Sequence, residues 1–327
     1  MSVAVEPIAE AARRLAEGDV VAFPTETVYG LGADATNPRA IARIFALKGR
    51  PADHPLIVHI GEPAALADWV AAIPDEARAL AERFWPGPLT MILARSPRVP
   101  DAVTGAQDTV GIRCPSHPIA RSLLAEFARV GSGGVAAPSA NKFGHVSPTQ
   151  ARHVREEFGE GLMILEGGAC EVGLESTIVD LSRGSAALLR PGAVSRADLE
   201  SVLGYAPRER DANAPRASGT LAAHYAPRTA LVLVSSEGLE RLLAQRADAA
   251  VLALRKRSSS ARIVSWIVAP ADAIGYGHDL YANLRALDAA GARLIVVEAP
   301  PRNPVWEAVN DRLARAAASD PGVDDEP

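Results

Sequence analysis

The chain has 327 residues, a formal net charge of −5 at pH 7, and 48% hydrophobic residues. This length suits about two domains, and the acidic balance argues against a protein that binds nucleic acid through an overall positive field. No apolar run reaches the roughly 20 residues of a membrane-spanning helix, and the N-terminus lacks the basic-then-apolar order of a signal peptide. We therefore expect a soluble, cytoplasmic protein without a membrane partner.

Cysteine and lysine are both rare. Cys114 and Cys170 have no metal-type spacing, which predicts buried free thiols. The basic residues are almost all Arg, and Lys occurs only at positions 48, 142 and 256. In so arginine-rich a chain, a retained Lys favours a role for a compact, flexible point charge; the alternative is that a few lysines persist by chance.

Hydrophobic periodicity predicts a mixed α/β domain over residues 1–204. Asn37 can cap a helix over 38–47 that has Pro38 at its first position, and Lys48 ends it. The polar segment 96–108 is expected as an exposed loop, and the sequence from Ser147 to Gln150 predicts a helix start with a capping box. The other expected strands are 20–23, 56–60, 89–94, 109–113, 133–138, 162–165, 176–181 and 186–189, and the other expected helices are 6–17, 63–70, 75–84, 117–129 and 195–203.

The composition changes after residue 204. Residues 205–228 are rich in Pro, Ala and charge without a clear period, which predicts a linker. Over 229–319, expected strands alternate with expected helices. The strands are 230–234, 249–254, 262–268 and 293–297, and the helices are 236–246, 278–290 and 304–318. This alternation predicts a small α/β domain. The acidic tail 320–327 is expected to be disordered.

Two polar clusters suggest an anion site. Lys48 and Arg50 flank a glycine at a helix end and can converge on one polyphosphate; alternatively, they form a solvated basic turn, in which Lys48 complements the helix dipole. Ser139 and Asn141 follow the carboxyl end of a strand, where open α/β sheets bind ligands. An ordinary Asx turn is the alternative there.

Three further segments are less informative when taken singly. They are PTETVYGLG at 24–32, GLEST at 173–177 and HYAP at 224–227. The glycines of the first permit close backbone approach to a ligand, but neither GxxxxGK[ST] nor GxGxxG is present. Turn and packing residues are the simplest interpretation of each. The aromatic pair of HYAP indicates that the linker packs against a domain or covers a site.

Together these segments are specific. The segments that carry a family resemblance are PTETVYGLG, KGRP with HPLIVHI, APSAN, STIVD with RPG, and HYAP. In order and spacing they resemble the long two-domain form of the threonylcarbamoyl-AMP synthase family (YrdC-like). The resemblance implies a first domain with a YrdC-like twisted open α/β sheet and a deep cavity, a linker at 205–228 over the active site, and a small Rossmann-like C-terminal α/β domain. It implies that L-threonine, bicarbonate and ATP give threonylcarbamoyl-AMP and pyrophosphate, for N6-threonylcarbamoyladenosine (t6A) in tRNA.

The resemblance also implies a set of site residues. Lys48 and Arg50 are expected to be catalytic, and the position of His54 departs from the asparagine usual in the family. Arg113 is a natural bidentate partner for the threonine carboxylate. Magnesium is expected with ATP, and no protein metal site. The expected ATP contacts are Lys48, Arg50, His54, Thr109, Ser139, Asn141, Ser147, Arg190, His224 and Tyr225, and the expected threonine contacts are Thr27, His59, Arg113, Ala137 (through its backbone), Ser176 and Thr177.

Two other functions stay open. One is an RNA-binding module with a concave basic face, against which the net charge of −5 argues. The other is a carbamoyl-AMP-forming relative, whose usual zinc-finger and acylphosphatase segments are not visible. The expected partners are ATP, L-threonine, bicarbonate and the downstream tRNA threonylcarbamoyl-transfer machinery; stable binding of tRNA is not expected.

Overall fold

The computed structural model describes residues 5–245, 248–257 and 263–318, which form two compact units. The first unit comprises residues up to Phe143 and Pro148–Thr220, and the second comprises Gly144–Ser147 and the residues from Leu221. The segment 205–228, predicted as a linker, is therefore divided between the units. The tail 320–327, residue 246 of an expected helix and residue 262 of an expected strand lie outside the described residues.

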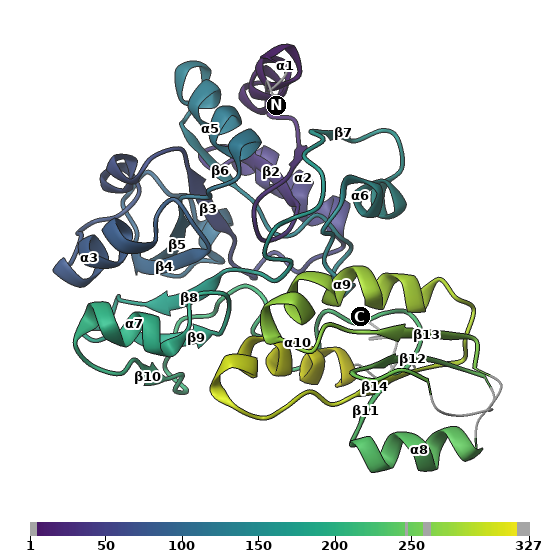
Figure 1. Ribbon diagram of the computed structural model, residues 1–327. Helices are drawn as coiled ribbons and strands as arrows, with labels where there is room; N and C mark the ends of the chain where they lie inside the picture. Colours follow the sequence, from purple (N-terminus) through teal and green to yellow (C-terminus); the bar gives the residue numbers. More distant parts are fainter. Residues whose placement is uncertain (1–4, 246–247, 258–262, 319–327) are drawn as a thin grey trace. The chain divides into compact units, whose positions relative to one another are not determined.

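Within the described residues, the first unit contains one ten-stranded mixed sheet, in the order β10-β9-β8-β4-β5-β3-β6-β2-β1-β7 (Figure 1). This confirms the predicted α/β class. The strands are β1 (Val21–Phe23), β2 (Gly30–Asp34), β3 (Ile57–Ile60), β4 (Leu89–Ala94), β5 (Thr109–Arg113), β6 (Gly134–Ala136), β7 (Met163–Ile164), β8 (Thr177–Asp180), β9 (Ala187–Arg190) and β10 (Arg208–Glu209).

Most helices of the first unit lie where the periodicity predicts them. Helix α2 has Asn37 as its N-cap, with the side chain accepting from the backbone N–H groups of Arg39 and Ala40, and Gly49 ends it in the left-handed conformation at φ 63°. The helices are α1 (Val5–Ala16), α2 (Pro38–Lys48), the 3₁₀ helix η1 (Pro63–Asp68), α3 (Asp75–Phe84), α4 (Asp101–Thr104), α5 (Pro118–Val130), α6 (Ala151–Phe158) and α7 (Arg196–Leu203).

Three sequence predictions need correction. The segment 96–108 is not simply an exposed loop, because it contains α4, and Val99 and Val103 are buried in the core. The capping box at Ser147 is wrong: α6 begins at Ala151, and its N-cap residue makes no side-chain capping bond. Strand β2 was not predicted, because its glycines suggested a loop.

The glycine at position 32 is required by packing inside the first unit. A Cβ atom there would lie 2.6 Å from Val135 Cγ1 and 2.7 Å from Phe23 Cε1. The bare backbone of β2 thus makes room for the Phe23 ring, which meets the His59 ring edge-on with 6.0 Å between centroids. In this structure the glycine serves protein packing, rather than the close approach of a ligand that the sequence suggested.

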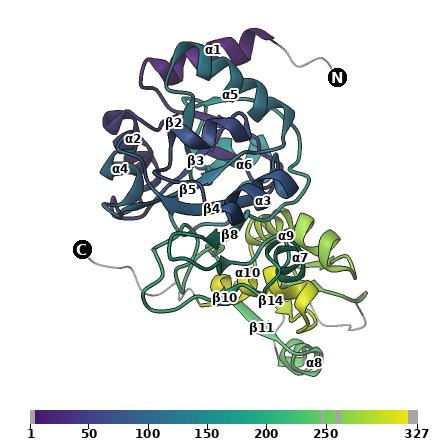
Figure 2. The ribbon, with the colours of Figure 1, turned by 90° about the vertical axis from the view of Figure 1, so that its left-hand side faces the viewer.

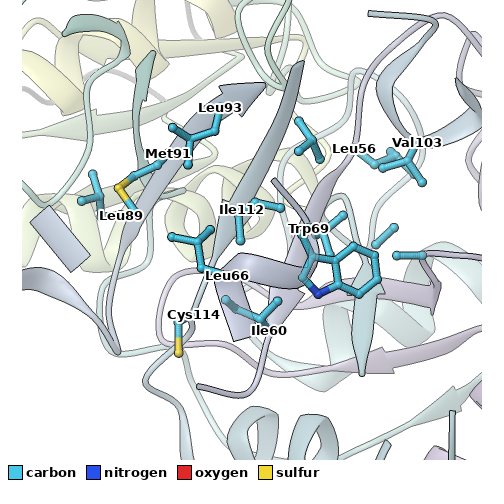
Figure 3. Packing of buried hydrophobic residues seen from close by; sticks show 14 of the residues in the cluster. Leu56, Ile60, Leu66, Trp69, Leu89, Met91, Leu93, Val103, Ile112 and Cys114 are labelled. Atoms are coloured by element: carbon cyan, nitrogen blue, oxygen red, sulfur yellow. The ribbon is translucent and has the colours of Figure 1, made fainter. Parts of the chain in front are cut away.

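The two faces of the sheet differ in what covers them. One face packs into the main hydrophobic core, to which Met91 and Ile112 contribute from the strands and Trp69 from beyond η1 (Figure 3). On the other face, α1 and α5 lie side by side and cover the end of the sheet near β1 and β6 (Figure 2). A smaller cluster that includes Ile92 and Ile178 lies near β8 and β9.

The second unit contains an all-parallel four-stranded sheet, in the order β11-β14-β12-β13. Helix α8 lies on one side of this sheet, and α9 and α10 lie on the other (Figure 1). This agrees with the predicted small α/β domain. The elements are β11 (Leu231–Val234), α8 (Ser236–Gln245), β12 (Ala249–Ala253), β13 (Ser265–Val268), α9 (Ala273–Asp288), β14 (Leu294–Glu298), the 3₁₀ helix η2 (Pro304–Trp306) and α10 (Glu307–Ala317).

Two further expectations can be compared with the described residues. Cys114 and Cys170 are both free and buried, as predicted, and burial raises the pKa of the Cys114 thiol to about 11. None of the helices in the described ranges combines the length and the hydrophobicity needed to cross a membrane.

Candidate active site

A polar row crosses the middle of the large sheet on the face opposite the main core. His59 of β3 pairs with Arg113 of β5, and Arg113 pairs with Thr90 of β4. Because directly paired residues of adjacent strands project to the same face, the three side chains lie together. Each is less than 5% exposed. The row therefore brings two predicted threonine ligands, His59 and Arg113, into one buried place.

Two polar atoms of this row lack an aligned hydrogen-bond partner among the described residues. They are Arg113 Nη2 and His59 Nδ1. A buried polar atom without a partner is costly, so such atoms point to a ligand or an ordered water. Burial, and then the nearby Arg113 charge, lower the pKa of His59 to about 3, so its imidazole is neutral at pH 7.

The turn after β1 borders the same region. The hydroxyl of Thr25 lies 2.8 Å from the hydroxyl of Thr27 and accepts from the Val28 N–H at 3.2 Å. Between these threonines, Glu26 Oε1 lies 2.7 Å from Arg113 Nη2, with both side chains at most 5% exposed. Thr27 is itself completely buried. The turn therefore presents the predicted ligand Thr27 together with a carboxylate that sequence reasoning did not single out.

Ser176 connects the predicted threonine and ATP residues. Its hydroxyl lies 2.8 Å from the Thr90 hydroxyl. The Arg190 guanidinium donates to the Ser176 carbonyl at 2.9 and 3.0 Å and to its hydroxyl at 3.1 Å. Arg190 also donates to the Ser218 carbonyl at 2.8 Å. Arg190, predicted to contact ATP, is thus held against a predicted threonine ligand.

Two predicted threonine contacts are engaged in backbone structure. The Thr177 hydroxyl donates to the Val194 carbonyl at 2.8 Å and accepts from the Val194 N–H at 3.1 Å, which ties β8 to the turn before α7. The N–H of Ala137 donates to the Ile57 carbonyl at 2.9 Å. Its carbonyl is therefore the backbone group through which Ala137 would act.

The Lys48 side chain joins the end of α2 to the turn at 139–141. Its ammonium donates to the Ser139 carbonyl at 2.6 Å and also to the Asn141 carbonyl. In the reverse direction, the Lys142 ammonium donates to the Leu47 carbonyl at 2.6 Å. Burial, and next the Arg50 charge, hold the pKa of Lys48 well below its usual range. The two polar clusters singled out in the sequence are therefore one structural unit.

Arg50 extends from this junction toward a small cavity. Its Nη2 donates to the Pro55 carbonyl at 3.0 Å and lies 3.4 Å from the Ser218 hydroxyl. The Phe143 ring has its centroid 5.9 Å from the Arg50 guanidinium carbon and 5.3 Å from the centroid of the His54 ring. Burial, and then the Arg50 charge, lower the pKa of His54. Arg50 and His54, both predicted to contact ATP, thus flank one aromatic ring.

The small cavity opens on the polar face of the sheet. Gly111 lies in its lining, and a Cβ atom there would lie 3.3 Å from Thr90 Cγ2. Arg216 anchors the covering segment through bonds to the Asp53 carboxylate and the Gly105 carbonyl. The lining includes Thr109, which is half-buried and predicted to contact ATP. The lining residues are Pro55, Leu56, Ile57, Thr90, Ile92, Gln107, Thr109, Gly111, Ile178, Arg216, Ala217 and Ser218.

Three predicted ATP residues belong to the second unit. They are Ser147, His224 and Tyr225. Tyr225 is buried with a left-handed backbone, φ 65°, which is uncommon for a residue other than glycine. Its ring lies 4.2 Å from the His224 ring and 5.6 Å from the Tyr281 ring between centroids. The aromatic pair is therefore anchored in the second unit instead of lying in a free linker.

A broad groove elsewhere on the first unit has no predicted site residue in its lining. It runs between η1 and α5 and carries both acidic and basic side chains, including Glu62, Asp68, Arg98 and Arg121. Among the described residues, no group of three or more His, Cys, Asp or Glu side chains is arranged to hold a metal ion.

Fold and site together define an α/β protein with a buried polar region that contains several cationic side chains. The Sua5_yciO_yrdC model, described as "Telomere recombination", matches residues 13–192, and the model of the threonylcarbamoyl-AMP synthase C-terminal domain matches residues 194–318. The chain belongs to this two-domain family of threonylcarbamoyl-AMP synthases, which confirms the resemblance seen in the sequence.

Individual relatives span nearly the whole chain. The Pyrococcus abyssi threonylcarbamoyl-AMP synthase is 38% identical, over 94% of this chain and 93% of its own length. The Bacillus subtilis threonylcarbamoyl-AMP synthase is 39% identical, over 95% and 92%. The crystal structure of P. abyssi Sua5 complexed with L-threonine has a TM-score of 0.88 at 36% identity, and the match covers 97% of this chain and 96% of that one.

Proposed function

We propose that this chain is an L-threonylcarbamoyladenylate synthase, a nucleotidyltransferase that uses L-threonine, bicarbonate and ATP. The observation that carries the proposal is the buried Arg113, whose Nη2 lacks an aligned acceptor among the described residues, beside the neutral His59. A buried guanidinium with a donor atom that lacks an aligned acceptor is a natural receptor for a carboxylate. The similar structure with bound L-threonine supports an amino acid as the source of that carboxylate.

At the threonine end, each side chain has a chemically suitable task. Arg113 takes the α-carboxylate, and the Thr27 hydroxyl and the His59 imidazole are polar partners for the substrate hydroxyl. Ser176 and the Ala137 carbonyl complete the ring of polar groups. The Thr177 hydroxyl already makes hydrogen bonds with both the carbonyl and the N–H of Val194. We therefore propose that Thr177 holds the start of β8 in place instead of contacting threonine.

At the phosphate end, the cations Lys48, Arg50 and Arg190 lie in the first unit. We propose that Arg50 and Arg190 bind phosphate oxygens and that Ser139, Asn141, Thr109 and His54 contact the nucleotide. Binding of a phosphate would favour the charged form of Lys48, whose pKa burial now depresses. Lys48 would then hold the turn at 139–141 and contribute charge in the same step.

Ser147, His224 and Tyr225, which belong to the second unit, stay predicted nucleotide contacts. Magnesium would arrive as the Mg²⁺ complex of ATP, and phosphate oxygens and water are the ligands that it prefers there. When bound, the ion would supply charge neutralisation for the departing pyrophosphate.

The proposed reaction has two bond-forming steps. The neutral amine of threonine attacks the carbon derived from bicarbonate, which forms a carbamate and releases water. A carbamate oxygen then attacks the α-phosphorus of ATP, and the bond to the bridging oxygen breaks as pyrophosphate leaves. The protein's part is positioning and charge stabilisation by Arg113, Arg50 and Lys48. The unstable product would pass to tRNA threonylcarbamoyl-transfer machinery in the cytoplasm, for t6A formation.

A pyrophosphate-release assay tests this proposal. We expect release to require ATP, bicarbonate and L-threonine together. Arg50→Ala and Lys48→Ala should each lower the rate by about 100-fold or more, because each removes a charged contact in the transition state. Arg129→Ala, which changes an exposed arginine of α5, is the matched control and should behave as the unaltered protein. Full activity in both site variants would contradict the phosphate assignment.

The two rival functions give different results. An RNA-binding module would retain RNA in a filter assay with a steep loss as salt rises, and it would not release pyrophosphate. A carbamoyl-AMP-forming relative would use carbamoyl phosphate in place of bicarbonate and threonine. We expect neither behaviour.

A further inference from the structure

Glu26 is a fully enclosed carboxylate that none of the proposed substrate contacts uses. Its Oε1 atom lies 2.7 Å from Arg113 Nη2, and the side chains of the pair are 3% and 5% exposed. Burial alone would raise the pKa of Glu26. The charge of Arg113, helped by backbone N–H groups such as that of Ser116, outweighs burial and brings the pKa of Glu26 below its ordinary value. Glu26 is therefore a carboxylate anion at neutral pH.

Backbone groups from two other segments hold Glu26 in place. Its Oε2 accepts from the Ser116 N–H at 3.1 Å, just beyond β5. Its own carbonyl accepts from the Val172 N–H at 2.7 Å, in the loop before β8. The preceding Thr25 closes the turn with its hydroxyl. A carboxylate fixed in this way defines where its partner guanidinium can lie.

The ion pair leaves the guanidinium able to bind another anion. Although the two atoms are close, the Nη2–H bonds are not directed at Oε1, so neither atom has an aligned hydrogen-bond partner among the described residues. Arg113 Nε makes one long bond, of 3.4 Å, to the Gly87 carbonyl. Glu26 thus compensates the charge of Arg113 without taking up its donors.

Stability alone does not account for such a pair. Replacing a buried ion pair by well-packed apolar residues is often neutral or stabilising. A pair kept inside a polar site, with unused donors on its cation, is better explained by preorganisation of that cation.

We propose that Glu26 is a positioning residue that holds the Arg113 guanidinium with its free N–H donors facing the carboxylate of the amino-acid substrate. This inference rests on the proposed function, because it needs an amino acid as substrate. Glu26 touches Arg113 and not the reacting atoms, so its removal should weaken the use of threonine more than the use of ATP.

The first experiment measures kinetic constants for Glu26→Gln, which keeps the shape and removes the charge. We expect the KM for threonine to rise by about 10-fold or more, with the KM for ATP within about twofold of its original value. Glu298→Gln is the matched control, because Glu298 is also buried and also accepts a backbone N–H, from Leu254 at 3.0 Å, but lies in the second unit. It should change neither constant.

A double-mutant cycle shows whether Glu26 acts through Arg113. Arg113→Lys keeps the charge but loses the planar fork. In that background, Glu26→Gln should raise the KM for threonine by less than about threefold, because the geometry that Glu26 maintains is already lost. Effects of the two substitutions that simply multiply would overturn the proposal, as would an equal rise in both KM values.

A second variant decides the matter if Glu26→Gln does not fold. Glu26→Asp keeps the charge but withdraws it by one methylene, so the threonine KM should rise by about threefold or more with a normal ATP KM; an unchanged threonine KM would overturn the proposal. If the unaltered protein shows no threonine-dependent pyrophosphate release, the proposed function itself fails. An active unaltered protein with an unaffected Glu26→Gln variant refutes only the role of Glu26.

Discussion

Ile112 and Arg113 are consecutive residues of β5, both buried, yet they face opposite sides of the same sheet. Ile112 pairs with Val58 and Met91 and packs in the main hydrophobic core. Arg113 pairs with His59 and Thr90 in the polar row. Around β5, the first face makes apolar packing contacts, whereas the second carries charges and donors without an aligned acceptor among the described residues. We infer that Ile112 serves mainly stability and that Arg113 serves mainly chemistry.

The largest expected effect is on the polar face. Arg113→Gln should lower kcat/KM for threonine by about 100-fold or more, because two charge-assisted hydrogen bonds to the substrate carboxylate are lost. Steady-state pyrophosphate release as a function of threonine concentration measures this. Arg121→Gln, at an exposed position of α5, is the control. A kcat/KM for threonine equal to that of the control would contradict the assignment of Arg113 to substrate binding.

The neighbouring residue should behave in the opposite way. Ile112→Ala removes a fully buried side chain and should lower the free energy of unfolding by about 2–5 kcal/mol. The KM for threonine should stay near its original value as long as the protein is folded. Urea unfolding followed by kinetics on the folded variant tests both expectations. A large rise in KM without loss of stability would show that the faces are not separable.

The smallest expected effect, when it is measured per pH unit, is a pH dependence of stability due to His59. Its pKa in the folded protein is about 3, which is below the unfolded value near 6.5, so between these values the unfolded chain binds one more proton. Because of His59, the free energy of unfolding should therefore fall as the pH drops below about 6.5. The decrease should be at most about 1.4 kcal/mol per pH unit. Urea unfolding at several pH values should show a shallower slope in His59→Gln. An identical slope in both proteins would mean that His59 is not buried in neutral form.

Local signals predicted much of the fold. Asn37, Pro38 and Gly49 mark both ends of α2 through capping chemistry that depends on neighbouring residues. Strand β2 was missed because its glycines are explained by the distant Phe23 and Val135. The predicted helix start at Ser147 failed because the next two carbonyls, of Pro148 and Thr149, accept from the N–H groups of Tyr29 and Cys170. Long-range partners of this kind cannot be read from local patterns.

The candidate site shows the same division. Motif resemblance identified His59, Arg113, Ser176 and Arg190, and the structure brings them together. The motif resemblance could not show that Lys48 binds the carbonyls of the turn at 139–141. The resemblance also did not single out Glu26. Its place between Thr25 and Thr27 in the PTETVYGLG segment was the one sequence signal that could have drawn attention to it. The pairing of β3 with β5 places His59 beside Arg113, and the turn after β1 places Glu26 against Arg113. The sequence alone does not show either contact.

The most direct test of the proposed function is mass spectrometry of the reaction product formed with ¹³C-labelled bicarbonate. We predict threonylcarbamoyl-AMP whose mass increases by the one labelled carbon, formed only when ATP and L-threonine are both present. Absence of this product, or a product of unchanged mass in labelled bicarbonate, would contradict the proposed function.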